Sequence, residues 1–180
     1  MLFRSKKVDF RTKIRSERSA HQPAQEWQLL LQSPEIKSAR VIASYFSYGF
    51  EPDTTLLNGQ LLEQNKVLLL PRMESDRSLT WIQWRGQINQ LQKEKKILEP
   101  MGDEYFGPID VVIIPALAVD INGYRLGQGG GSYDRALAKL NGWKVALVND
   151  DEILDSPLPV EDHDQRVDAV VTPTRILRFK

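Results

Sequence analysis

The feature that most restricts the fold is a glycine-rich junction in the second half of the chain. Four glycines fall within the five residues 127–131, and an apolar-periodic segment that predicts a helix begins directly after them. Glycine has no Cβ, so successive backbone N–H groups can converge on a ligand and φ can become positive without strain. A helix N-terminus adds a positive dipole end and unpaired N–H groups. The junction is therefore a candidate phosphate site, although a glycine-rich surface turn fits the glycines alone equally well.

Charged residues on either side of the glycines strengthen the phosphate interpretation. Arg125 precedes the glycines and can supply a fixed cation, while Asp134 in the first helical turn can hold Mg²⁺ against the same phosphates. Asp134 also fits the plainer role of an acidic residue that favours a helix N-terminus. Loop, cation and carboxylate together indicate a nucleoside triphosphate as the ligand.

Two familiar phosphate-binding motifs fit this segment poorly. A P-loop requires a lysine directly after its last glycine, and no lysine lies between Gly123 and Arg135. The dinucleotide fingerprint would place its third glycine on Ser132, and the preceding predicted strand, at 110–115, ends far upstream of the glycines. A dinucleotide-dependent oxidoreductase is therefore disfavoured.

Composition predicts one soluble domain over residues 1–180. The chain is 41% apolar and 27% charged, which is ordinary for a globular protein. Lys+Arg and Asp+Glu both number 24, and this balance removes the overall attraction expected of a nucleic-acid binder. No apolar stretch approaches the roughly 18–20 residues needed to cross a bilayer, and the lack of cysteine excludes disulfides and thiolate sites. We therefore expect a cytoplasmic protein that binds neither nucleic acid nor membranes.

Segments typical of strands and helices alternate along the chain. Strands are predicted over residues 41–46, 66–71, 79–84, 110–115, 143–148 and 169–172. Helices are predicted within 9–31, where Pro34 ends the run, and over 54–64 and 133–140, while the polar stretch 87–96 also fits a helix. Trp81 and Trp84 have odd spacing and are expected on opposite strand faces. Strand–helix–strand units build parallel sheets, so the predicted fold class is α/β, a three-layer α/β/α domain with a mostly parallel central sheet.

The segment that begins at Gly123 resembles the signature of the 5-formyltetrahydrofolate cyclo-ligase family, also called 5,10-methenyltetrahydrofolate synthetases. That signature is close to Gly-x-Arg-Leu-Gly-x-Gly-x-Gly-x-Tyr-Asp, and it is matched at Gly123, Arg125, Leu126, Gly127, Gly129, Gly131, Tyr133 and Asp134. Further segments resemble the same family in the same order, at 11–15, 51–54, 70–72, 97–100, 158–164 and 167–172. The resemblance therefore spans most of the chain.

The resemblance implies an enzyme that converts 5-formyltetrahydrofolate to 5,10-methenyltetrahydrofolate, with ATP as co-substrate, Mg²⁺ as cofactor and release of ADP and phosphate. The expected catalytic residues are Arg125, Tyr133 and Asp134, although Tyr133 also fits a buried structural tyrosine. The expected metal ligands are Asp134 and Asp164, and Asp164 together with His163 also fits an exposed loop pair. No Ser-His-Asp or Cys-His machinery is needed, because the substrate supplies both nucleophiles.

ATP is expected to contact two parts of the chain. Arg11 and Arg15 lie four residues apart on one helix face, where two cations can grip a polyphosphate, although a solvated basic face fits as well. The other expected ATP contacts form one continuous run: Arg125, Leu126, Gly127, Gln128, Gly129, Gly130, Gly131, Ser132 and Tyr133.

The folate is expected to contact Tyr48, Asp53 and Ser132. A carboxylate suits the donor-rich edge of a pterin, so Asp53 fits this role, as it also fits the cap of the following helix; Glu51 is the substitute if the register differs. Ser132 stands where the family often has an aromatic residue, which puts substrate stacking in question. We expect a monomer or a weak dimer. The alternative function is a non-catalytic relative that binds folate or nucleotide.

Overall fold

The computed structural model describes residues 2–20 and 22–180. Its helices within these residues are α1 (Leu2–Ser19), α2 (Gln28–Leu31), α3 (Pro34–Ser38), α4 (Thr55–Glu63) and α5 (Ser132–Leu137). Short 3₁₀ turns lie at η1 (Ile88–Gln90) and η2 (Asp150–Glu152). The strands are β1 (Val41–Ala43), β2 (Val67–Met73), β3 (Leu79–Trp84), β4 (Leu91–Glu94), β5 (Ile97–Pro100), β6 (Val111–Pro115), β7 (Ala118–Asp120), β8 (Arg125–Leu126), β9 (Trp143–Leu147), β10 (Ile153–Leu154), β11 (Ala169–Val171) and β12 (Ile176–Arg178).

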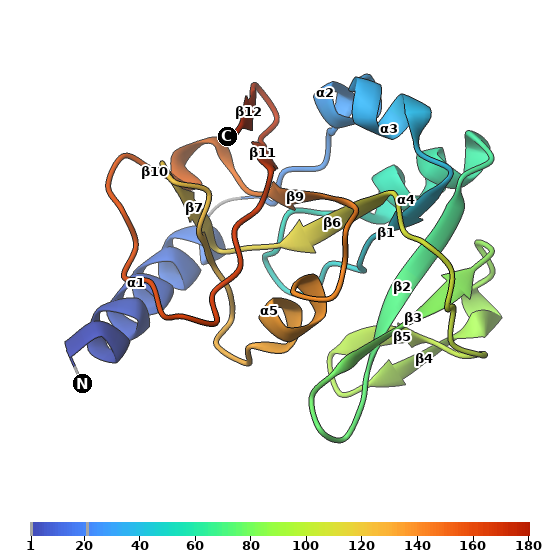
Figure 1. The fold of residues 1–180 in the computed structure, drawn as a ribbon, viewed down its shortest axis with the longest axis horizontal. Helices are drawn as coiled ribbons and strands as arrows, with labels where there is room; N and C mark the ends of the chain where they lie inside the picture. The colour runs from blue at the N-terminus through green and yellow to red at the C-terminus, as the bar shows by residue number, and fades with distance from the viewer. Residues whose placement is uncertain (1, 21) are drawn as a thin grey trace.

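A mostly parallel sheet forms the centre of the molecule (Figure 1). Within the described residues it has seven strands in the order β12-β11-β9-β6-β1-β2-β3. The neighbours from β11 to β2 run parallel, and antiparallel β12 and β3 form the two edges. A small sheet, β10-β7-β8, and the hairpin β4-β5 lie beside it. The predicted α/β class with a mostly parallel central sheet is therefore confirmed.

Alternate residues of the central strands pack on opposite faces of the sheet. Ile113 belongs to the core cluster that includes residues of α2, α3 and α4, whereas its neighbour Val112 packs in the cluster that contains Leu137 of α5. Helices therefore cover both faces. Trp81 and Trp84 lie in these two different clusters and are both buried, so the expectation of opposite faces is confirmed.

The N-terminal region differs from the prediction in its helix boundaries. α1 already begins at Leu2, and Pro34 starts α3 instead of only ending the preceding helix. Proline suits this first helical position because its missing N–H would have no partner there. Ser33 caps the same helix, since its side chain accepts a hydrogen bond from the Ile36 amide at 3.3 Å.

The polar stretch 87–96 is a 3₁₀ turn followed by a β-strand, so the helix interpretation was wrong. β4 and β5 form a hairpin in which Glu94 faces Ile97, and Lys95 in the turn has a positive φ of 56°. Positive φ is uncommon for lysine, and nothing in the sequence marks this position as a turn. The mostly exposed strand β4 also lacks the apolar alternation by which strands are recognised.

The glycines do not follow the central strand directly, because β7 and β8 lie between β6 and the loop. β8 ends at Leu126, immediately before the loop, but it pairs antiparallel with β7 in the small sheet. The strand before the glycines is therefore not a strand of the parallel sheet, as it would be in the dinucleotide fold, in agreement with the poor fit of that motif. α5 ends at Leu137, three residues earlier than predicted, where i to i+3 hydrogen bonds take over.

Candidate functional site

The glycine loop forms one wall of a cavity of about 940 Å³, large enough for a small-molecule ligand. The cavity is lined by parts of α1, the segment between β1 and α4, the loop from β8 to α5, and residues 161–165. Side chains of Met73 and Ile97, at the hairpin side, complete its lining. Segments from both ends of the chain therefore meet at this cavity.

The loop backbone has the left-handed conformations that its glycines permit. Gly129 has a φ of 104°, and Gly131, the N-cap of α5, has a φ of 67°. A Cβ on Gly131 would approach Arg135 Nη1 to 3.1 Å. Ser132 follows as the first residue of α5 and is buried at the cavity wall. The glycine-rich segment 127–131, on which the prediction of a phosphate site is based, therefore lines a cavity.

Three cations on one face of α1 reach this region. Arg11 Nε donates to the Gly127 carbonyl at 2.9 Å, and Arg15 Nη2 donates to Gln128 Oε1 at 2.6 Å. Lys7, one turn earlier, donates to Asp164 Oδ2 at 2.5 Å. Arg11 is partly buried and lines the cavity, whereas Arg15 is exposed, does not line the cavity and contacts Gln128 of the loop. Lys7 was missed by sequence reasoning, although its position four residues before Arg11 places it on the same helix face.

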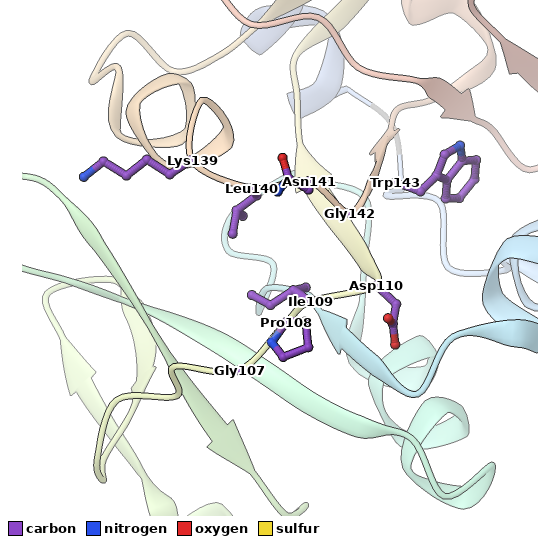
Figure 2. Close-up of a pocket in the computed structure, with 9 residues that line it drawn as sticks. All are labelled: Gly107, Pro108, Ile109, Asp110, Lys139, Leu140, Asn141, Gly142 and Trp143. Atoms are coloured by element: carbon purple, nitrogen blue, oxygen red, sulfur yellow. The ribbon is translucent and has the colours of Figure 1, made fainter.

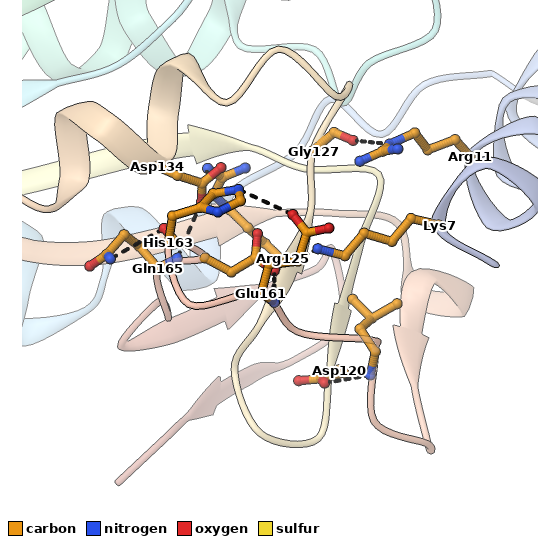
Figure 3. A network of polar contacts seen from close by, with 11 residues as sticks. Lys7, Arg11, Asp120, Arg125, Gly127, Asp134, Glu161, His163 and Gln165 are labelled. Carbon is orange, nitrogen blue, oxygen red and sulfur yellow. Dashed lines mark hydrogen bonds and ion pairs between the residues drawn. The ribbon is translucent and has the colours of Figure 1, made fainter. Parts of the chain in front are cut away.

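Arg125 and Asp134 form an ion pair inside the cavity (Figure 3). Arg125 Nη2 donates to Asp134 Oδ1 at 2.9 Å, and the same oxygen accepts the Gln165 amide at 3.2 Å. The Arg125 side chain is only 4% exposed, and its guanidinium lies 5.7 Å from the centre of the Tyr133 ring. Its Nε is buried and has no hydrogen-bond partner among the described residues. A buried cation with an unpaired donor in the lining of a cavity fits a site for an anionic ligand.

Asp164 belongs to the same polar network. It accepts hydrogen bonds from Lys7 and from the Glu161 amide at 2.8 Å, while His163 Nε2 lies 3.3 Å from Glu161 Oε2 (Figure 3). Burial alone would raise the pKa of Asp164, but the hydrogen bond from Lys7 and the Glu161 amide bring it below its ordinary value. Asp164 is therefore held as a carboxylate beside the glycine loop.

The acidic residues of the cavity do not form a preformed metal site. In residues 2–20 and 22–180 no group of three or more His, Cys, Asp or Glu side chains is placed to share a metal ion. Asp134 and Asp164 line the same cavity, and each already faces a cation. Mg²⁺ is commonly held by one or two carboxylates together with substrate phosphates. The two carboxylates therefore fit an ion that arrives with phosphate oxygens.

Of the two acidic candidates after β1, Glu51 lines the cavity and Asp53 is engaged elsewhere. Asp53 Oδ1 accepts hydrogen bonds from Ser47 Oγ at 3.2 Å and from the Thr55 amide at 2.8 Å, which fixes the start of α4. Glu51 lies at the cavity beside Tyr48, whose amide donates to Glu51 Oε2 at 3.2 Å. The structure thus favours the substitute candidate that the sequence left open.

Glu51 is unusual because it is a carboxyl group with little access to solvent. It is 7% exposed, and burial raises its pKa despite hydrogen bonds from the Tyr48 amide and from Gln128 Nε2 at 3.4 Å. Burial also raises the pKa of Tyr133, with the negative charge of Glu51 adding to the effect. A protonated phenol and a carboxyl with a raised pKa therefore line one side of the cavity, where they can exchange hydrogen bonds with a polar ligand.

A second, smaller pocket of about 410 Å³ lies at the amino-terminal ends of β6 and β9 (Figure 2). Its lining includes Asp110, Lys139 and Trp143, and it contains none of the residues predicted to bind or react. The Asp110 carboxylate there accepts the amides of Arg40 and Val41, both at 2.8 Å. This pocket is at the opposite end of the parallel strands from the glycine loop.

No helix in the described part of the chain is long and apolar enough to cross a membrane.

Comparison with known proteins identifies relatives over nearly the whole length. The profile of the 5-formyltetrahydrofolate cyclo-ligase family matches residues 3–173. A 5-formyltetrahydrofolate cyclo-ligase of Mycolicibacterium smegmatis is 38% identical over 150 residues, covering 77% of this chain and 76% of the relative. The protein of that name from Escherichia coli is 32% identical over 179 residues, covering 91% and 98%. The solution structure of the Aquifex aeolicus 5,10-methenyltetrahydrofolate synthetase has a TM-score of 0.81 and 28% identity, and covers 97% of this chain and 93% of that one.

Proposed function

We infer the reaction from the membership of this chain in the 5-formyltetrahydrofolate cyclo-ligase family. The chain is an enzyme of this family, a ligase that converts 5-formyltetrahydrofolate to 5,10-methenyltetrahydrofolate with ATP as co-substrate. We propose that the reaction takes place in the cavity beside the glycine loop. The observation that carries this proposal is Arg125, a cavity-lining residue whose side chain is only 4% exposed and whose buried Nε lacks a hydrogen-bond partner among the described residues.

The chemistry requires activation of a poor electrophile. The formamide oxygen attacks the γ-phosphorus of ATP, the bond to ADP breaks, and the formyl carbon gains a phosphate leaving group. N10 of the folate then attacks this carbon, N10 loses its proton, and the C–O bond breaks to release phosphate. The protein must therefore align two substrates and stabilise negative charge on the phosphoryl oxygens.

Each part of the cavity has a role in this scheme. The amides of the loop, Arg125 and the α1 cations Lys7 and Arg11 bind the triphosphate and balance its charge. Asp134 and Asp164 would hold magnesium, which supplies positive charge shared by the phosphate oxygens when bound.

The folate lies on the other side of the cavity. Glu51 accepts hydrogen bonds from the pterin N–H groups, with Tyr48 beside it, and Tyr133 donates from a phenol that stays protonated. Tyr133 also lies against Arg125, so it is placed between the phosphate side and the folate side. Ser132 is too small to stack on a pterin.

An absorbance assay tests the proposal. The pure protein is incubated with 5-formyltetrahydrofolate and Mg²⁺, with and without ATP, and formation of the methenyl product is followed in the near ultraviolet. Arg125→Lys is expected to lower kcat/KM by about 100-fold because lysine lacks the forked geometry of the guanidinium. Arg178→Lys, which alters an exposed ion pair on β12, is the matched control and should react like the wild type. Absence of any ATP-dependent rise in the wild type would overturn the proposal.

A further inference from the structure

The last turn of α1 contains a buried ion pair that the reaction scheme does not use. Arg18 is 6% exposed and its partner Glu152, in η2, is 5% exposed. The pair is bidentate, with Arg18 Nε to Glu152 Oε1 at 2.5 Å and Nη2 to Oε2 at 2.7 Å. Two parallel charge-assisted hydrogen bonds fix both the distance and the orientation of the two groups. This contact is therefore far more directional than an apolar contact of the same size.

The remaining partners of the pair join α1 to the ends of two central strands. Arg18 Nη2 also donates to the carbonyl of Ala116, directly after β6, at 2.7 Å. Glu152 accepts the backbone amide of Asn149 at 2.7 Å and its side-chain amide at 2.9 Å, and Asn149 lies two residues after the neighbouring strand β9. The C-terminal end of α1 is thus attached to the carboxyl edge of the parallel sheet.

Among the side chains of α1 that the structure describes, apolar packing involves one small cluster. Ile14 is buried there with Leu117, Leu126 and Leu158, and the partly buried Phe10 of the same helix packs against this cluster. The helix runs alongside β7 and β10, outside the two layers that cover the main sheet (Figure 1). The orientation of α1 therefore depends strongly on its polar contacts.

Orientation matters because the cations that reach the cavity lie toward the other end of the helix. At a rise of about 1.5 Å per residue, the Lys7 backbone lies roughly 16 Å along the axis from Arg18. A tilt of about 10° at Arg18 would displace Lys7 by about 3 Å, which is more than a hydrogen bond tolerates. Arg11, nearer the attachment, would be displaced by a smaller amount.

We propose that Arg18 is a positioning residue for the nucleotide: its ion pair with Glu152 fixes α1 so that Lys7 and Arg11 reach the triphosphate. This inference rests on the proposed function of the cavity. Arg18 itself does not line the cavity. Its effect on the reaction passes through α1.

The test replaces both charged partners at once, by Arg18→Met/Glu152→Met, because removing one would leave a buried charge without a partner. The Michaelis constant for ATP is expected to rise about tenfold. The Michaelis constant for 5-formyltetrahydrofolate should change little. The midpoint of thermal unfolding should fall by a few degrees, because the Ala116 carbonyl and the Asn149 amides lose their partners. Hydrogen exchange of the α1 amides in the ligand-free protein should become faster. Arg178→Met/Glu35→Met, which removes an exposed bidentate pair, is the control and should change none of these values.

Two outcomes overturn the proposal: a folded double variant with an unchanged Michaelis constant for ATP, or one in which α1 exchanges as slowly as in the wild type. If the double variant does not fold, Arg18→Lys is judged by the same two measurements, because it keeps the charge and loses the fork. A wild type without ATP-dependent turnover would refute the proposed function. Hydrogen exchange would still decide whether Arg18 orders α1.

Discussion

Individual side chains of the cavity are paired with opposite charges before any ligand binds. Arg125 pairs with Asp134 and Lys7 pairs with Asp164, at 2.9 and 2.5 Å. Each cation therefore neutralises a carboxylate that would otherwise repel an incoming triphosphate. In the proposed complex the same carboxylates would face magnesium, so we expect the ion to bind together with the nucleotide and not alone.

Asp134→Asn tests whether this carboxylate acts in turnover or only in folding. The asparagine oxygen can still accept from Arg125 and from the Gln165 amide, so the thermal midpoint should fall by only a few degrees. The loss of charge should lower kcat by about 100-fold, measured by formation of the methenyl product. Asp134→Ala is the comparison, since it removes both hydrogen bonds. If Asp134→Asn lost as much thermal stability as Asp134→Ala, and its activity fell only in step with that stability, Asp134 would have a structural role.

Glu51→Gln tests the buried carboxyl through the pH dependence of stability. Burial raises the folded-state pKa of Glu51 above its ordinary value of 4.5, so the folded protein binds this proton more tightly than the unfolded chain. The stability contributed by the protonated group is full below about pH 4.5 and is lost as the pH rises through the folded-state pKa. Glutamine does not ionise, so the variant does not lose stability in this way as the pH rises. The free energy of unfolding of the variant, minus that of the wild type, should therefore increase when the pH is raised from about 4 to about 7.5.

Urea unfolding at the two pH values measures the difference in the free energy of unfolding. The exposed Glu63 of α4 provides the same chemical change, as Glu63→Gln, away from the cavity. An equal pH-dependent gain in both variants would contradict the assignment to burial of Glu51.

Among the elements, the glycine loop and α4 each contain a glycine, but replacement by alanine is expected to have opposite effects on stability in the two. Gly131 caps α5 with a φ of 67°, whereas Gly59 lies in the middle of α4 with open space where a Cβ would be. Alanine is strained in the first setting and favoured in the second.

Gly131→Ala should lower the free energy of unfolding by about 1–2 kcal/mol, and Gly59→Ala should raise it by about 0.5–1 kcal/mol. Only Gly131→Ala should also raise the Michaelis constant for ATP, because the loop amides would shift. Thermal unfolding and steady-state kinetics of the two variants provide the measurement. A Gly131→Ala protein as stable as the wild type would show that this backbone is not constrained.

Elements with strong periodicity were predictable, and those defined by tertiary pairing were not. The run 110–115 is a continuous apolar strand, and it forms β6 at the centre of the sheet. β7 and β8 are short and are defined by tertiary pairing, β8 with β7 and β7 also with β10, so neither has a pattern of its own. The turn of the hairpin β4-β5 contains Lys95 with a left-handed backbone conformation, which cannot be predicted from a lysine in the sequence.

For the molecule as a whole and for the cavity alike, positive and negative charges balance. The formal net charge is +0, and the cations that line the cavity, Lys7, Arg11, Arg125 and Arg135, are matched by the carboxyl groups of Glu51, Asp134, Glu161 and Asp164. Attraction for a triphosphate therefore depends on where the individual cations lie, and not on a net positive charge of the chain or of the cavity.

Salt should weaken ATP binding without affecting the fold. Raising the ionic strength from about 0.05 M to about 0.5 M shortens the screening length several-fold, so the Michaelis constant for ATP should rise. The midpoint of thermal unfolding should stay nearly constant, since apolar packing on both faces of the sheet stabilises the core. Steady-state kinetics and thermal unfolding in the same buffers measure both. A Michaelis constant independent of salt would contradict a binding site formed by these cations.

The separation of the site residues along the chain explains which of them could be identified from the sequence. The loop residues are contiguous, so their shared position could be predicted from their order alone. Glu51 and Asp53 both follow β1, and only the folded structure assigns Asp53 to the start of α4 and Glu51 to the cavity. Lys7 joins Asp164 across a sequence separation of 157 residues, a contact that no local pattern encodes.

That long separation has a consequence for folding during synthesis on the ribosome. At about 5–20 residues per second, synthesis from Lys7 to Asp164 takes roughly 8–30 s. During this interval α1 has been synthesised and Asp164 has not, so the ion pair between Lys7 and Asp164 can form only after residues 161–165, which complete the cavity lining, have been made.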